Sequence, residues 1–275
     1  MIKALEFPRK EFATKEELFK ALKDNKKELI SLKKAETKNA DAVSFGSIEV
    51  IKKTDLTNKS EGNVANPESL SVKVVINTTN FLDSHGDVHI NGIWNKSISD
   101  NISFLHLQEH NRSFDKIISD NAKGYTQLMT WKELGLPFEG STEALIFDST
   151  IEKKRNEFML NQYSNGWVKN HSVGMRYVKL ELAINSDAEW DKEEKAVWDK
   201  YYYLIANKDV ADEKGYFWAV TEAKIIEGSA VVMGSNSATP TLNNKYEPSD
   251  DTLENEPPID GTQNDEKKNY YKHLI

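Results

Sequence analysis

The stretch Ser172–Ile184, which reads SVGMRYVKLELAI, decides how the middle of the chain folds. From Tyr177 onward apolar and polar residues alternate, which is the pattern of a half-buried β-strand. Before it, residues 151–165 have a helical pattern, and Gly166 stands where a C-terminal helix cap is expected. A serine, Ser172, therefore lies at the start of this strand, shortly after the helix ends.

Further strands are predicted on both sides of this one, because their residues are β-branched, aromatic or alternating. They are expected at 70–77, 102–107, 124–130, 143–147, 216–224 and 225–233. A charged, aromatic-rich helix is expected at 188–206. Runs of short strands with a few interspersed helices predict an α+β fold, with a mostly antiparallel sheet or barrel as its core and helices flanking it.

Three regions are expected along the chain. They are an N-terminal helix with a linker (1–69), a core domain (70–240) with a helical insertion (185–215), and an acidic disordered tail (241–275). Thr14 and Glu17 form a capping-box pattern at the start of the N-terminal helix. The tail contains three prolines among acidic and amide residues, so it is not expected to bury enough apolar surface to fold.

Composition excludes several classes of protein. The 275 residues carry 44 acidic and 36 basic side chains, a net charge of −8, and no cysteine. The lack of cysteine excludes a disulfide scaffold, a cysteine zinc site, an iron–sulfur cluster and a thiol nucleophile. The net acidity argues against specific nucleic-acid binding. No stretch approaches the roughly 18 apolar residues of a membrane span, and no apolar signal core is present at the N-terminus.

Two constellations of residues could carry chemistry. His106-Leu-Gln-Glu109-His110 fits the H-x-x-E-H pattern, in which two helical imidazoles bind zinc and the glutamate acts as base. The residues before it read as a strand and those after it as a turn, which disfavours this zinc-peptidase interpretation. The second constellation pairs Ser172 with His110, because a serine needs a base of near-neutral pKa to become a nucleophile. On composition and spacing alone, this is one of many His/Ser pairs.

Four segments in a fixed order extend the second constellation. They are Asp83-Ser-His-Gly-Asp-Val88 with Asn91-Gly-Ile-Trp94, Ile102-Ser-Phe-Leu105 with Glu109-His110, Asn165-Gly166 with His171-Ser-Val-Gly-Met175, and Ile226-Glu-Gly-Ser-Ala-Val-Val-Met233 with Ser237-Ala238. In their sequence motifs, and in the order of these motifs along the chain, the four segments resemble the prohead (capsid maturation) proteases of tailed bacteriophages. These are serine proteases related in fold to the herpesvirus assembly protease, so the resemblance implies a herpesvirus-protease-like core over residues 70–240.

The resemblance implies a role for each matching residue. Ser172 would be the nucleophile, His110 the general base and then acid, and Glu227 the group that orients His110. Gly174 would belong to the oxyanion region.

Alternatives to these assignments stay open. His106 is in phase with His110 and could replace it. His171 stands where the family commonly has an apolar residue, and it could be a tuning group or an alternative base. The insertion at 185–215 separates Ser172 from Glu227 more than is usual in the family, so Glu222 is the fallback for the third member.

The resemblance also implies a biological setting. The chain would be an endopeptidase inside the procapsid in the host cytoplasm, where it would cleave scaffold, segments of the major capsid protein and itself. Homodimerisation is expected, as in related viral proteases, and no metal, cofactor, membrane or specific nucleic-acid partner is expected. The alternative function is that of an inactive or fused scaffold-type capsid assembly protein.

Overall fold

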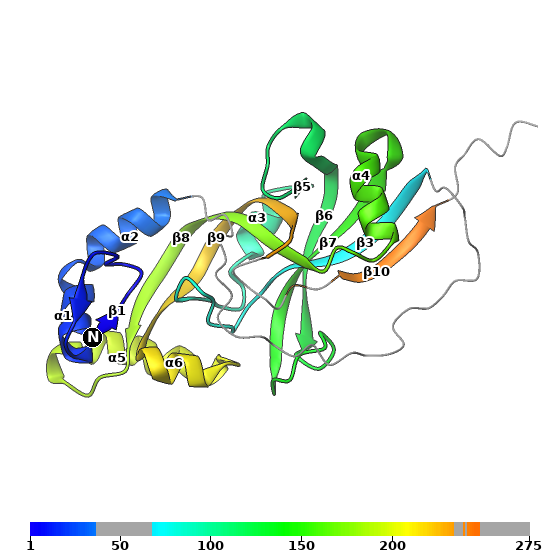
Figure 1. The fold of residues 1–275 in the computed structure, drawn as a ribbon. Helices are drawn as coiled ribbons and strands as arrows, with labels where there is room; N and C mark the ends of the chain where they lie inside the picture. Colours follow the sequence, from blue (N-terminus) through cyan, green and yellow to red (C-terminus); the bar gives the residue numbers. More distant parts are fainter. Residues whose placement is uncertain (37–67, 234–238, 240, 248–275) are drawn as a thin grey trace, which may run out of the picture.

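The computed structural model describes residues 1–36, 68–233, 239 and 241–247 (Figure 1). The strands in this part of the chain are β1 (Ile2–Lys3), β2 (Glu11–Phe12), β3 (Ser69–Thr78), β4 (Asp87–His89), β5 (Phe104–Gln108), β6 (Ile117–Thr130), β7 (Ser141–Glu152), β8 (Asn170–Ile184), β9 (Tyr216–Val231) and β10 (Thr241–Glu247). The helices are α1 (Lys15–Asp24), α2 (Lys26–Ala35), α3 (Asn95–Ser99), α4 (Lys153–Ser164), α5 (Lys192–Tyr201) and α6 (Lys208–Lys214).

The fold is α+β, as predicted, and its main sheet has eight strands. They follow the order β10-β3-β7-β6-β5-β9-β4, and β8 pairs with β9. Most pairs are antiparallel, but β4 and β5 both run parallel to β9, so the sheet is mixed. In the described part of the chain this path is open at both ends, so the predicted alternative of a closed barrel is wrong. No pairing joins β10 to β4 or β8 there, and closure would require one.

β8 and β9 form a long antiparallel hairpin, and the predicted insertion is the connection between the two strands. Ile184 is paired with Tyr216, and the residues between them are helical, as expected, forming α5, α6 and short 3₁₀ turns. The length of the insertion therefore has no effect on which residues lie opposite one another farther along the hairpin.

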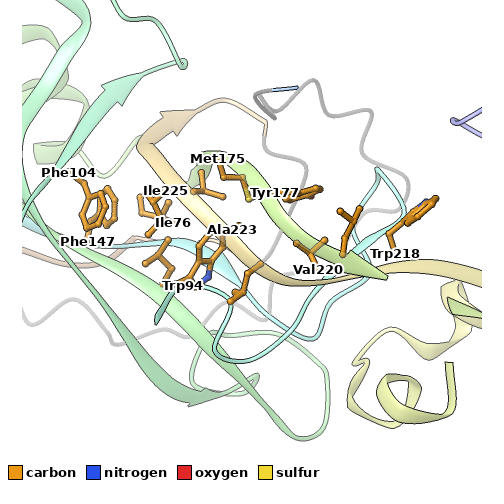
Figure 2. Close-up of a cluster of buried hydrophobic side chains, with 14 of the residues drawn as sticks. Ile76, Trp94, Phe104, Phe147, Met175, Tyr177, Trp218, Val220, Ala223 and Ile225 are labelled. Carbon is orange, nitrogen blue, oxygen red and sulfur yellow. The ribbon is translucent and has the colours of Figure 1, made fainter. Parts of the chain in front are cut away.

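Buried side chains along this hairpin form the main core. Figure 2 shows a row that runs from Trp218 and Val220 past Tyr177 and Met175 towards two phenylalanines, Phe104 and Phe147. The rings of Phe104 and Phe147 are stacked with their centroids 5.3 Å apart. Gly124 permits this, since a Cβ at that position would lie 2.6 Å from Phe104.

The N-terminal segment folds as two helices instead of the one expected. Thr14 caps α1 by accepting a hydrogen bond from the backbone N–H of Glu17, as the capping-box pattern predicts. The helix ends at Asn25, whose backbone is not helical, and α2 begins directly after it. Within α2, Leu29 is buried, whereas Leu32 is exposed.

These two helices pack on the core domain. In Figure 1, α1 and α2 (blue) lie beside α5 and the far end of β8 and β9. Nζ of Lys26 lies 2.6 Å from the carboxylate of Glu194 on α5. Lys33 on α2 is buried, and its Nζ lies 2.6 Å from Oδ1 of Asp87 on β4. The N-terminal helices are therefore an integral part of the folded unit.

The sheet continues past the predicted end of the core domain at residue 240. β10 pairs antiparallel with β3, so residues 241–247 of the expected tail form a strand, whose backbone groups pair with β3. The rest of the expected tail, and most of the expected linker at 37–67, lie outside the described residues. None of the helices in the described ranges is long and apolar enough to cross a membrane.

Candidate active site

The ladder between β8 and β9 brings two distant segments together on one face of the sheet. Ser172 is paired with Ser229, and Gly174 is paired with Glu227. Alternate residues of a strand share a face, so these four positions form one continuous patch. Gly228 alternates with them and faces the opposite side, where the hydrophobic core packs against it.

His110 reaches this patch from the end of β5. This strand runs parallel to β9, with Gln108 paired to Ala230. Glu109 and His110 then adopt left-handed backbone conformations, with φ angles of 52° and 55°, which are uncommon for residues other than glycine. The backbone N–H of His110 donates to Oγ of Ser229 over 3.1 Å. This bond ties the strained turn directly to β9.

The carboxylate of Glu227 has a partner at each oxygen. Nδ1 of His110 lies 2.6 Å from Oε1, and Oγ of Ser229 donates to Oε2 over 2.6 Å. Glu227 is almost fully buried, and a buried carboxylate without such bonds would be strongly destabilised. The carboxylate therefore holds the imidazole of His110 in a fixed orientation, which is what the third member of a serine-protease triad does.

The other ring nitrogen of His110 points away from the carboxylate. In a neutral imidazole whose Nδ1–H donates to a carboxylate, Nε2 carries the lone pair and accepts. Nε2 is buried and has no hydrogen-bond partner in the part of the chain that the structure describes, so Oγ of Ser172 does not bond to it there. Ser172 lies on the same face and is 6% exposed.

Gly174 makes room for Glu227. A Cβ atom at Gly174 would lie 2.8 Å from Cδ of Glu227 and closer still to Oε1. The backbone N–H and C=O of His171 both bond to Oγ1 of Thr239, and so point away from β9. Because these groups alternate along an antiparallel strand, those of Ser172 and Gly174 point towards β9. We therefore assign Gly174 a steric role. The oxyanion role that the resemblance implies stays a prediction.

His106 and His171, the alternative bases, lie on the opposite face of the sheet in a buried polar chain. Nε2 of His106 and Nε2 of His171 lie 3.1 Å and 2.9 Å from the hydroxyl of Tyr163 on α4. Nδ1 of His106 is 2.9 Å from Oγ of Ser149, and Nδ1 of His171 is 3.1 Å from the carbonyl oxygen of Thr239. Neither imidazole is free to face Ser172.

The charge state of these two histidines follows from their burial. Desolvation lowers the pKa of His106 to about 3, with a further contribution from the neighbouring His171. Desolvation also lowers the pKa of His171 to about 4. Both imidazoles are neutral near pH 7, so this chain of hydrogen bonds contains no buried charge at that pH.

Glu222, the fallback for the third member, is bound elsewhere. Its carboxylate lies 2.5 Å from Nζ of Lys179 and 3.9 Å from Nζ of Lys96. The hydrogen bond from Lys179 lowers the pKa of this half-buried carboxyl. Glu227 is therefore the carboxylate that contacts His110.

The zinc interpretation does not fit this geometry. It requires His106 and His110 on one face of a helix, but residues 104–108 form strand β5. His106 is paired with Gly228 and shares its core-facing side, whereas His110 contacts Glu227 on the other side. No group of three metal-ligating side chains is found among the described residues.

Ser229 and Tyr163 are the contributors to this region that sequence reasoning missed. Ser229 alternates with Glu227 on β9, so their shared face could have been recognised from the period of a strand. Tyr163 comes from α4, and nothing local in the sequence indicates that its hydroxyl joins two histidines from β5 and β8.

Comparisons of the chain with protein-family models, with curated proteins and with solved structures find no match.

Proposed function

We propose that this chain is a serine endopeptidase of the prohead maturation type, with Ser172, His110 and Glu227 as its catalytic triad. The observation that carries the proposal is the hydrogen bond of 2.6 Å between Nδ1 of His110 and Oε1 of Glu227. It leaves Nε2 unpartnered within the described structure, on the same face as Ser172. A carboxylate, an oriented imidazole and a serine on one face are the set that nucleophilic acyl transfer needs.

In the first half of the reaction, Oγ of Ser172 attacks the scissile carbonyl carbon while Nε2 of His110 takes the hydroxyl proton. Glu227 stabilises the imidazolium that forms, without itself becoming protonated. When the C–N bond breaks, His110 gives that proton to the leaving amine. The products of this half are an ester on Ser172 and a free amino terminus.

In the second half, water attacks the ester. His110 takes a proton from this water, and the ester C–O bond breaks. The same proton then returns to Oγ of Ser172, which restores the enzyme and releases a carboxylate. Each half uses His110 once as base and once as acid, so its fixed orientation serves both.

The herpesvirus-protease-like core and the setting come from the sequence resemblance. The substrates would be scaffold, segments of the major capsid protein and the chain itself, cleaved inside the procapsid in the host cytoplasm. Homodimerisation belongs to the same proposal.

The test combines labelling with cleavage. The purified full chain is treated with a fluorophosphonate, which reacts with activated serines, and is separately incubated with casein. We expect labelling at Ser172 and cleavage of casein, both lost in Ser172→Ala and in His110→Gln. Ser119→Ala is the matched control, since Ser119 is equally buried but belongs to β6 and bonds to Asn121.

The alternative function, an inactive scaffold-type assembly protein, predicts the opposite pattern. The folded wild type would then be neither labelled nor able to cleave casein or itself, and Ser172→Ala would behave identically. If chains that are shown to be folded by a native unfolding transition give this pattern, the protease proposal is wrong.

A further inference from the structure

A pocket of about 310 Å³ opens beside the proposed active site, where β9 ends and β8 begins. Residues next to the proposed triad line it. Asn170 lies two positions before Ser172 on the same face of β8, and Glu109 directly precedes His110. Val231 lies two positions after Ser229 on the same face of β9. Residues of α4 also line the pocket, and α4 packs on the opposite face through Tyr163. The pocket therefore lies at the end of the sheet, between its two faces and within two residues of Ser172 and Ser229.

The wall of this pocket exposes large apolar side chains. Trp167 is 64% exposed, Phe158 on α4 is 58% exposed, and Val232 is 76% exposed. Single exposed apolar residues are ordinary, but a group of them around a concave site marks a binding surface. Tryptophan is also among the residues that contribute most when such surfaces bind.

The backbone of Trp167 is held rigidly although its side chain is exposed. Its N–H donates to the carbonyl oxygen of Gln162, and the N–H of Gly166 donates to that of Tyr163. With Gly166 at a φ of 66°, these two bonds form a Schellman motif that ends α4. A fixed backbone lowers the entropy lost on binding, because only the indole torsions remain to be ordered.

Two polar groups at the rim are already bonded within the protein. Oε1 of Glu109 accepts from the backbone N–H of Val232, and Nδ2 of Asn170 donates to the carbonyl oxygen of Val232. The pocket thus offers mainly apolar contact. Its volume is near the lower end of the roughly 300–1,000 Å³ range of ligand pockets, which suits a single large side chain.

We propose that this pocket is a specificity subsite that binds a bulky apolar side chain of the polypeptide substrate, close to the scissile bond. The inference rests on the proposed protease function and names the substrate class: polypeptides with an aromatic or large aliphatic residue near the cleaved bond. Trp167 and Phe158 would form the walls that contact this side chain.

The experiment uses a library of internally quenched peptides in which one position at a time is varied between alanine and large apolar residues. For the wild type, we expect one position near the cleaved bond to favour a large apolar residue over alanine by about tenfold or more, the range that apolar pockets reach. In Trp167→Ala and Phe158→Ala, this preference should fall severalfold, mainly through KM. Tyr203→Ala is the control, since Tyr203 is similarly exposed at 66% but lies on the insertion, and it should keep the preference.

Different failures have different meanings. If the wild type cleaves peptides and Ser172 is labelled, but the preference is absent or survives in both pocket variants, the subsite is overturned and the protease stands. If the wild type neither cleaves nor is labelled, both proposals fall. If Trp167→Ala abolishes a dimer in sedimentation without changing the preference, the pocket belongs to a second copy of the chain, and the subsite is again overturned.

Discussion

The carboxylate of Glu227 fills the space that a side chain at Gly174 would need. The two residues are paired across β8 and β9, and a Cβ at Gly174 would lie 2.8 Å from Cδ of Glu227. A glycine opposite Glu227 is thus a steric requirement of this arrangement. The lack of a side chain at Gly174 also explains how β9 can bury Glu227 against β8 while the two strands remain paired.

Gly174→Ala should therefore displace the carboxylate from His110. We expect a loss of activity with a cost in unfolding free energy of about 1–3 kcal/mol, the usual range for overpacking. Casein cleavage and urea unfolding measure the two effects. The double variant Gly174→Ala/Glu227→Asp, whose shorter acid leaves room for the methyl group, should recover part of the stability lost. Full activity in Gly174→Ala would contradict the steric role.

Glu227→Gln should abolish most activity, because an amide cannot stabilise the imidazolium of His110 and favours the wrong tautomer. The corresponding change in a serine-protease triad lowers kcat by roughly 10⁴-fold. Glu222→Gln is the matched control, since Glu222 lies on the same strand but contacts lysines, and its kcat should remain near that of the wild type. Equal effects of the two substitutions would show that the acid was misassigned.

Ser229→Ala should lower kcat more than it changes KM. The substitution removes the donor to Oε2 of Glu227 and the acceptor for the backbone N–H of His110. A hydrogen bond to a charged group contributes about 1.5–3 kcal/mol, which corresponds to roughly 10- to 100-fold in rate. Steady-state kinetics provide the measurement, and Ser229→Thr, which keeps the hydroxyl, should restore part of kcat. If KM alone rises, Ser229 has no positioning role.

Acidification should destabilise the protein through His106 and His171. Their folded-state pKa values, about 3 and about 4, lie below the unfolded value of 6.5. The unfolded state therefore binds more protons between about pH 4 and pH 6.5, so the stabilisation present above pH 6.5 is lost as the pH falls through this window. Well inside it, each histidine contributes a slope of about 1.4 kcal/mol per pH unit.

Urea unfolding at several pH values measures this slope. His171→Asn should reduce this slope by the contribution of one histidine. Between pH 7.5 and 8.5, the two histidines should contribute almost nothing to the slope. A free energy of unfolding that does not change from pH 7 to pH 5 would rule out two neutral, buried imidazoles.

Lys33→Met should destabilise the fold by about 3–5 kcal/mol, the usual cost of leaving a buried charge without its partner. Asp87 is fully buried and bonds to both Lys33 and the hydroxyl of Tyr177. Burial on its own would lower the pKa of Lys33, but the carboxylates of Asp87, Glu6 and Asp83 together outweigh it and the pKa is raised.

The matched control is Lys34→Met, since Lys34 is the exposed neighbour on the same helix, and it should change the unfolding free energy by less than about 0.5 kcal/mol. Equal stability of the two variants would mean that the ion pair between Lys33 and Asp87 contributes nothing to the stability of the fold.

Sequence patterns were sufficient where the decisive interaction is local. The alternation from Tyr177 onward predicted β8, Gly166 marked the end of α4, and the capping box marked the start of α1. In each case the pattern reports on neighbouring residues of one segment, which propensity and capping can specify. The α+β class followed from the succession of such segments.

The arrangement of the candidate site depended on contacts between segments far apart in the chain. From sequence, His106, His110 and His171 were all candidates for the base. The register of β5 and β8 against β9 separates them, because a shift of one residue moves a side chain to the other face. The hairpin begins with the pairing of Ile184 and Tyr216, so the insertion does not change which residues pair farther along. Glu227 is therefore paired with Gly174, near Ser172, and Glu222 is not.

The sequence by itself therefore determined the elements and the residue types available for chemistry, among them the absence of any thiol. Only the tertiary structure decided which face each side chain occupies, that the sheet is open within the described residues, and that the N-terminal helices join the core. The physical reason is that strand register and burial depend on all the strands packing together, and no single segment contains that information.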